Sequence, residues 1–167
     1  MLDRRMLLSS VAGLGMVAAW KWFGFSGPVQ AAGKFEIEKT PEEWKRVLTP
    51  EQYYILREHG TERPYSSPLN NEHRRGIFAC AGCDLPLYSS DTKFESGTGW
   101  PSFYDHLPDA IGTSVDRTLG FARTEVHCRR CGGHLGHVFE DGPKPTGLRY
   151  CMDGLALNFK PAAAAPS

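Results

Sequence analysis

The sequence lacks an excess of positive charge. Its 19 Lys and Arg residues are balanced by 19 Asp and Glu residues, and no basic run occurs. A phosphate backbone requires a positive patch on the protein that binds it, so we expect no nucleic-acid partner. The 167 residues also lack an internal repeat beyond two Cys-x-x-Cys turns, and their number suits one domain. With 18 Gly, 12 Pro and 41% hydrophobic residues, that domain is expected to be compact and rich in turns.

A sixth cysteine is missing as well. Four of the five cysteines form two close pairs, Cys80 with Cys83 and Cys128 with Cys131. Cys151 is left without a neighbour, and an odd thiol needs an explanation of its own.

The two pairs predict a structural metal site. Two Cys-x-x-Cys turns can present four thiolates to one point, which is the tetrahedral shell that Zn²⁺ accepts. One Zn²⁺ held there would join distant β segments and contribute to folding. In an exported protein the pairs could instead form disulfides or act as a redox couple. A redox pair usually stands alone at the start of a helix, whereas these two lie among β and turn segments, which favours zinc.

Long apolar runs are missing except near the N-terminus. Two arginines at 4–5 precede an apolar run over 6–20, and small residues at 29–31 could be cut by a signal peptidase. This pattern predicts a twin-arginine export signal over 1–32 and a periplasmic protein. If the run were not cleaved, it would anchor the domain in the membrane.

Two short helices are predicted directly after this signal. Thr40 and Thr49 each precede a proline, and Glu43 and Gln52 follow three residues later as capping-box partners. Gly60 is expected to end the second helix.

The remaining sequence predicts short β-strands separated by Gly, Pro and Asp clusters. The expected strands lie within residues 75–80, 85–90, 113–116, 122–128, 136–141, 148–152 and 155–159. We therefore expect a mainly antiparallel β domain over 33–160 and a disordered tail over 161–167.

The last two strands are expected to form a hairpin. Asp153 and Gly154 favour a two-residue type I′ turn. Alternation then places Leu148, Tyr150, Met152, Leu155, Leu157 and Phe159 on a core face, and Arg149, Cys151, Ala156 and Asn158 on the other. A guanidinium near a thiol on that second face favours the nucleophilic thiolate. The alternative for Cys151 is a buried structural cysteine.

Two further stretches contain side chains that a nucleophile would need. His134 and His137 lie among glycines and are candidate proton donors, although lone histidines are often ordinary surface or core residues. Trp100 precedes Pro101, and its indole could form the apolar wall of a small pocket or simply belong to the core.

The stretches "TERPY", "GIFACAGCDLPLYSSDTKFESGTGWPSF", "RTEVHCRRCGGHLGHVFEDGP" and "PTGLRYC" together resemble the B class of peptide methionine-R-sulfoxide reductases. The resemblance runs over about residues 44–159. It implies two antiparallel sheets in a β-tent arrangement with short N-terminal helices, and a structural zinc on the four paired cysteines. It also implies that Cys151 is the attacking residue, that Trp100 cradles the S-methyl group of the substrate, and that His134, His137 and Arg149 line the polar side of the pocket.

The reaction implied is the reduction of methionine-R-sulfoxide in peptides or proteins. The Cys151 thiolate would attack the sulfoxide sulfur while a proton reaches the oxygen through His137. Methionine would leave and Cys151 would remain as a sulfenic acid.

The chain departs from the family pattern at two positions. Thr98 stands where many members carry a resolving cysteine, so we expect an external reductant, either a thioredoxin-like protein or a small thiol. Asp153 stands in the substrate pocket where members commonly have asparagine, and a carboxylate cannot donate a hydrogen bond when ionised. We expect a monomer.

Two other functions remain open from the residues alone. The chain could be a zinc-stabilised module that binds peptides without turnover, in which Cys151 has no role. It could also be a thiol-disulfide oxidoreductase that uses the Cys-x-x-Cys pairs.

Overall fold

The computed structural model describes residues 35–163. The predicted export signal over 1–32 and the end of the predicted tail, 164–167, lie outside the described residues. Among residues 35–163, no helix combines the length and apolar character that a membrane span requires.

Both predicted helices are present, α1 (Pro41–Val47) and α2 (Pro50–Glu58). The two expected capping boxes are confirmed, because each N-cap threonine exchanges hydrogen bonds with the residue three positions later. The second helix ends just before Gly60. His59 takes the left-handed conformation with φ of 55°, and the Gly60 N–H donates to the Tyr54 carbonyl.

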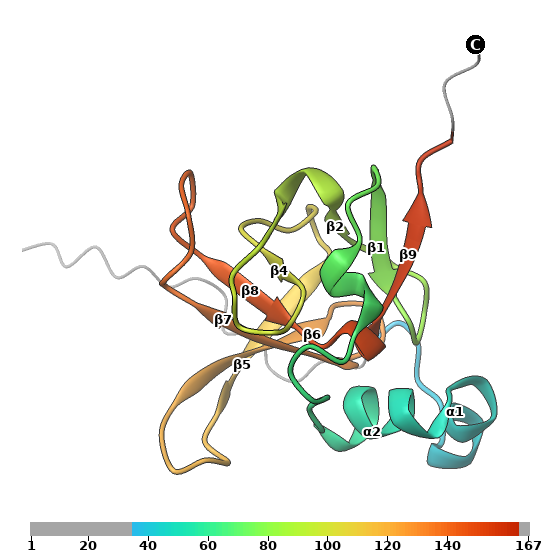
Figure 1. The fold of residues 1–167 in the computed structure, drawn as a ribbon. Helices are drawn as coiled ribbons and strands as arrows, with labels where there is room; N and C mark the ends of the chain where they lie inside the picture. The colour runs from blue at the N-terminus through green and yellow to red at the C-terminus, as the bar shows by residue number, and fades with distance from the viewer. Residues whose placement is uncertain (1–34, 164–167) are drawn as a thin grey trace, which may run out of the picture. The chain divides into compact units, whose positions relative to one another are not determined.

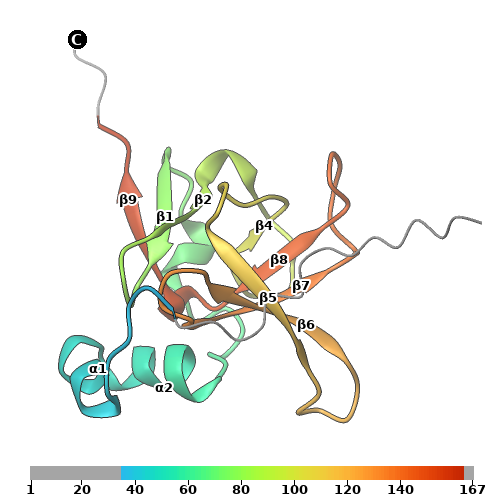
Figure 2. The same ribbon diagram turned by 180° about the vertical axis from the view of Figure 1, so that it is seen from behind.

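The described β-strands form two antiparallel sheets, as the resemblance implies. The three-stranded sheet has the order β2-β1-β9 and the six-stranded sheet the order β3-β4-β8-β7-β6-β5 (Figures 1 and 2). The strands are β1 (Gly76–Cys80), β2 (Pro86–Ser89), β3 (Lys93–Phe94), β4 (Ser102–Phe103), β5 (Ile111–Asp116), β6 (Arg123–Cys128), β7 (His134–Phe139), β8 (Arg149–Met152) and β9 (Leu157–Pro161). Three short 3₁₀ turns complete the described elements, η1 (Pro68–Asn71), η2 (Ser90–Thr92) and η3 (Gly154–Ala156).

The hydrophobic core draws residues from both sheets and both helices. Phe78 of β1 meets Phe103 of β4 edge-on at 4.9 Å between ring centroids, and Tyr88 of β2 stacks on Phe103 at 4.4 Å. Trp44 of α1 and Leu135 of β7 are also buried. These contacts hold the two sheets together, because burial of apolar area is the main stabilising term in folding.

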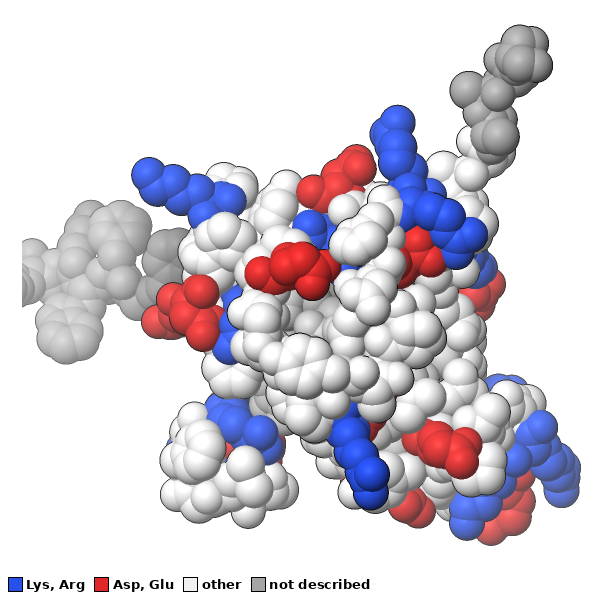
Figure 3. All heavy atoms as spheres, viewed as in Figure 1, with Lys and Arg blue, Asp and Glu red and all other residues white. Residues whose placement is uncertain are grey.

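Acidic and basic side chains are interspersed on the face shown in Figure 3. Exposed ion pairs among the described residues include Arg129 with Glu36 and Lys160 with Asp84. Exposed pairs of this kind contribute little to stability.

The predicted hairpin around Asp153 and Gly154 is wrong. β8 lies in the six-stranded sheet and β9 in the three-stranded sheet, so the two strands do not pair. Asp153 has φ of −65°, whereas a type I′ turn requires positive φ, and Gly154 begins η3. The alternation holds along β8, where Tyr150 and Met152 are buried, and again at Leu157 and Asn158, but it fails directly after the turn. Ala156 is buried there and Leu155 is exposed.

The hairpin fails because other segments bind its backbone. The Asp153 N–H donates to the Leu135 carbonyl of β7. The N–H groups of Gly154 and Leu155 donate to the carboxylate of Glu62. These buried hydrogen bonds override the local turn preference, since an unpaired buried amide is costly.

Gly136 allows β7 to approach β8 closely. Its φ is 146°, which L side chains rarely adopt, and a Cβ there would overlap the carbonyl oxygen of Cys151. The position of the Cys151 backbone therefore depends on the missing side chain at Gly136.

Gly136→Ala is expected to lower the free energy of unfolding by about 1–3 kcal/mol and to displace Cys151, because the new methyl group meets backbone that cannot yield easily. Urea unfolding and the rate of Cys151 alkylation would measure both effects. Gly120→Ala is the control, since Gly120 also has positive φ but open space around it. Equal losses in both variants would contradict the steric explanation.

Candidate active site and metal centre

The four paired cysteines converge at one point. Cys80 ends β1 and Cys128 ends β6, while Cys83 and Cys131 follow them in turns. The sulfur atoms of Cys80 and Cys131 are 3.7 Å apart, those of Cys83 and Cys128 are 3.4 Å apart, and all four lie within 4.8 Å of one another. None forms a disulfide. The sequence prediction that these residues form one cluster is confirmed.

The dimensions of this cluster suit a metal ion. Zn–S bonds of about 2.3 Å place the sulfurs of a tetrahedral site roughly 3.8 Å apart, close to the observed separations. The cluster could therefore hold a metal ion with thiolate ligands. Because β1 and β6 belong to different sheets, an ion there would join the two sheets directly.

A small cavity of about 120 Å³ contains most of the remaining candidate residues. Its lining consists of Thr61, Trp100, Arg123, Gly136, His137, Phe139, Cys151 and Asp153. Four residues singled out from the sequence thus meet here, namely Cys151, Trp100, His137 and Asp153. His134 and Arg149 do not line the cavity.

Cys151 lies on β8, in the interior of the six-stranded sheet, opposite Ser102 of β4 and His137 of β7. Burial raises the pKa of its thiol, although the Thr98 hydroxyl 3.8 Å away and the charge of Arg149 act in the opposite direction. The influence of Arg149 has the expected sign, because its guanidinium lowers the pKa of the Cys151 thiol. Burial outweighs the guanidinium.

Arg149 is held away from the cavity by two partners. Its Nε and Nη2 each donate to a carboxylate oxygen of Asp141 at 2.9 Å. Its guanidinium also lies over the ring of Phe139, 4.5 Å from the centroid. Arg149 therefore acts on Cys151 through its charge and supports Phe139, which lines the cavity.

His137 is oriented by a carboxylate that the sequence analysis did not identify. Its Nε2 lies 2.8 Å from Oδ2 of Asp116 on β5. The backbone N–H and hydroxyl of Thr118, followed by His137, hold the pKa of Asp116 well below its usual range. Burial lowers the pKa of His137, with Asp116 opposing this effect. An ionised Asp116 thus fixes the ring by accepting a hydrogen bond from its Nε2–H group.

Arg123 is a further cavity residue that sequence reasoning missed. It pairs with Asp116 at 2.5 Å, while its buried Nε has no hydrogen-bond partner among the described residues. A buried donor that lines a cavity is available to a ligand.

His134 is almost completely buried beside the cavity. Its Nδ1 lies 2.7 Å from Oε1 of Glu125, and its ring meets that of His137 at 5.4 Å between centroids. His134 can therefore position His137 but does not face the cavity.

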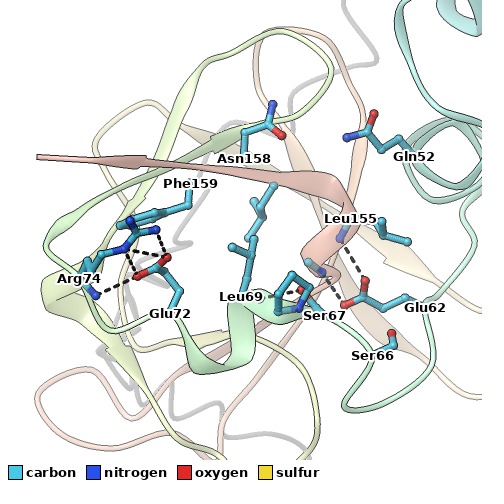
Figure 4. A pocket seen from close by; sticks show the side chains of 13 residues that line it. Gln52, Glu62, Ser66, Ser67, Leu69, Glu72, Arg74, Leu155, Asn158 and Phe159 are labelled. Atoms are coloured by element: carbon cyan, nitrogen blue, oxygen red, sulfur yellow. Dashed lines mark hydrogen bonds and ion pairs between the residues drawn. The ribbon is translucent and has the colours of Figure 1, made fainter.

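Glu62 connects the cavity to the loop that follows β8. Its carboxylate accepts the N–H groups of Gly154 at 2.6 Å and Leu155 at 3.0 Å, as Figure 4 shows. Its own N–H donates to Asp153, and its carbonyl accepts the Trp100 indole N–H at 3.2 Å. The stretch "TERPY" contains Glu62, but neither its spacing nor its composition indicates these contacts.

A second, larger cavity of about 820 Å³ lies on the carboxylate side of Glu62. Leu69 and Phe159 contribute apolar surface to it, and Glu72 pairs there with Arg74 (Figure 4). No residue singled out for chemistry lines it. Glu62 lines this cavity, whereas its neighbour Thr61 and its hydrogen-bond partner Asp153 line the one that contains Cys151.

Asp153 is 3% exposed and accepts the Glu62 N–H at 2.9 Å. Burial raises its pKa to about 7, and the charge of Glu62 adds to the rise. Asp153 is therefore a buried carboxyl that titrates near neutral pH, and the charge of its ionised form raises the pKa of Cys151.

A family model described as the SelR domain matches residues 48–161. The chain belongs to this family. It is 58% identical to a protein of Methanosarcina barkeri over 125 residues. This aligned stretch is 74% of this chain and 88% of the relative. It is 54% identical to a protein of Agrobacterium fabrum and 51% identical to one of Leptospira interrogans, in each case over 127 residues. Both aligned stretches are 75% of this chain, and they cover 94% of the first relative and 97% of the second. All three relatives are named peptide methionine sulfoxide reductase MsrB.

Asp153→Asn is expected to stabilise the fold increasingly as the pH rises from 5 to 8. The raised pKa means that the folded state holds the Asp153 proton more tightly than the unfolded chain does, so the stabilisation is complete below pH 4 and is lost as the pH passes 7. Asparagine stays neutral and avoids this loss, which we expect to reach about 1–3 kcal/mol. Thermal unfolding across the pH range would measure it.

Asp141→Asn is the matched control, because pairing with Arg149 lowers the pKa of Asp141. That variant should lose stability at neutral pH. A pH-independent difference between Asp153→Asn and the unmodified chain would contradict the burial of an ionisable group. Turnover of Asp153→Asn should equal or exceed that of the unmodified chain, since asparagine can donate a hydrogen bond to the substrate.

Proposed function

We propose that this chain reduces methionine-R-sulfoxide in peptides or proteins to methionine, with Cys151 as the nucleophile. The observation that carries the proposal is the meeting of Cys151, Trp100 and His137 in one cavity. The SelR family and the names of the relatives support the same reaction. The residues at 4–5 and 6–20 support export by the twin-arginine route, so the working place of the protein is the periplasm.

The cavity suits the end of an oxidised methionine side chain. Trp100 and Phe139 offer aromatic surface to the S-methyl group, while His137 and Arg123 offer N–H groups to the sulfoxide oxygen. The peptide arm points to the open side. Three different environments around one sulfur distinguish its two epimers, and the family resemblance favours the R form.

In the first half-reaction, the Cys151 thiolate attacks the sulfur and the oxygen takes a proton. His137 delivers this proton from its cationic form, which Asp116 holds by the other ring nitrogen. The hydroxyl then transfers to Cys151, methionine leaves, and a sulfenic acid remains. Turnover needs the thiolate of Cys151 and the cationic form of His137. Burial raises the pKa of Cys151 and lowers that of His137, so we expect turnover to have a bell-shaped pH profile.

In the second half-reaction, an external thiol attacks the sulfenic acid, water leaves, and a second thiol releases the mixed disulfide. Thr98, whose Oγ1 lies 3.8 Å from the Cys151 sulfur, supplies no thiol. The other four cysteines belong to the metal cluster. The reductant is therefore a thioredoxin-like protein or a small thiol.

The four-cysteine cluster is proposed to hold one Zn²⁺. Four thiolates complete a tetrahedral shell and leave no open position, so this ion has a structural role. Its ligands lie outside the cavity that contains Cys151.

The chain is expected to reduce half of a racemic methionine sulfoxide substrate with dithiothreitol and to retain one tightly bound zinc. Cys151→Ser should abolish turnover and keep the zinc, because a hydroxyl is a far weaker nucleophile near neutral pH. Chiral chromatography and metal analysis would measure both. A binding module would show no turnover, and an oxidoreductase of the Cys-x-x-Cys pairs would retain activity in Cys151→Ser.

Without reductant, the chain should yield one methionine per molecule and accumulate a sulfenic acid that dimedone traps. Thr98→Cys should instead give a disulfide with Cys151, because the new thiol would need only a short movement from the 3.8 Å position of the hydroxyl. Peptide mapping distinguishes the two products. A disulfide between Cys151 and a cysteine of the four-cysteine cluster in the unmodified chain, with release of metal, would contradict the single-cysteine mechanism.

A further inference from the structure

A second group of side chains with metal-binding atoms is formed by His59, Glu125 and His134. Each belongs to a different part of the fold. His59 follows the last turn of α2, Glu125 lies on β6, and His134 begins β7. Because α2 packs on β7, residues distant in sequence come together, and their possible ligand atoms all lie within 4.8 Å of one another.

Both imidazoles direct Nδ1 to the same carboxylate oxygen. The distance to Oε1 of Glu125 is 3.0 Å from His59 and 2.7 Å from His134, and the ring centroids are 5.1 Å apart. The hydroxyl of Ser114 donates to the other carboxylate oxygen at 2.5 Å. Ser114 thereby fixes the orientation of Glu125 and leaves Oε1 to the two imidazoles, as groups behind a metal ligand commonly do.

The group is buried on one side and open on the other. The side chains of His134 and Glu125 are 3% and 11% exposed, whereas that of His59 is 62% exposed. An ion could enter past His59 and keep a water molecule on that side.

We propose that His59, Glu125 and His134 bind one divalent transition-metal ion, such as Zn²⁺, Co²⁺ or Ni²⁺. Two imidazole nitrogens and one carboxylate oxygen are a ligand set that these ions accept. Bond lengths of about 2.0–2.2 Å place such ligand atoms roughly 3.3–3.6 Å apart, so the observed separations must widen by less than about 1 Å. When the ion binds, the proton on each Nδ1 moves to Nε2 or is released to solvent, and water occupies the fourth position.

This site differs in chemistry from the four-cysteine cluster. It offers nitrogen and oxygen ligands, whereas the cluster offers only sulfur. The proposal does not depend on the proposed reductase activity. The competing interpretation is a hydrogen-bonded cluster that only fastens the end of α2 to the sheet, and that interpretation gives no additional metal.

The test is a titration of the zinc-loaded chain with Co²⁺ in a Cys151→Ser background, which removes the one thiol outside the cluster. Calorimetry would count the ions, and visible absorption would identify the ligands. One further Co²⁺ per chain is expected. Its spectrum should lack the charge-transfer band that cysteine ligands produce, which excludes exchange into the four-cysteine cluster.

His59→Asn is the decisive variant, because asparagine tolerates the left-handed backbone at this position but removes the imidazole. It should weaken binding of the additional Co²⁺ by at least about tenfold. His73→Asn, which alters an exposed histidine outside the group, should bind as the parent does. The proposal is overturned if the parent takes up no additional Co²⁺, or if His59→Asn binds it as tightly as the parent.

Discussion

The hydrogen bonds of the buried Glu62 are the constraint on which the cavity depends. Its carboxylate binds two amides after β8, its N–H binds Asp153, and its carbonyl binds the indole of Trp100. One residue thus fixes two walls of the cavity and the point at which the chain leaves one sheet for the other. A buried amide or carboxylate without a hydrogen-bond partner in this position would destabilise the fold by more than a favourable local turn stabilises it.

The four-cysteine cluster brings side chains of both sheets together at a second place. Cys80 belongs to the strand that pairs with β9, and Cys128 to the six-stranded sheet. An ion held there would add metal–sulfur bonds between the sheets to the hydrogen bonds of Glu62 and the apolar packing.

Local patterns were sufficient to predict the helices, most strands and the cysteine cluster, because capping residues, alternation and Cys-x-x-Cys spacing act over a few positions. The cavity residues Cys151, Trp100 and His137 could be named from short motifs. Asp116 and Glu62 could not, since their partners lie far along the chain. The Asp153-Gly154 turn was misassigned because its preference is local, whereas its amides are bound by a distant carboxylate.

The small volume of the cavity has a consequence for the order of events in the proposed reaction. A space of about 120 Å³ is small for an oxidised methionine and a reducing thiol together. The backbone of Cys151 is also hydrogen-bonded between two neighbouring strands and cannot swing out to meet a reductant. In the proposed reaction, methionine would therefore leave before the reductant binds, and the protein would alternate between a thiol form and an oxidised form.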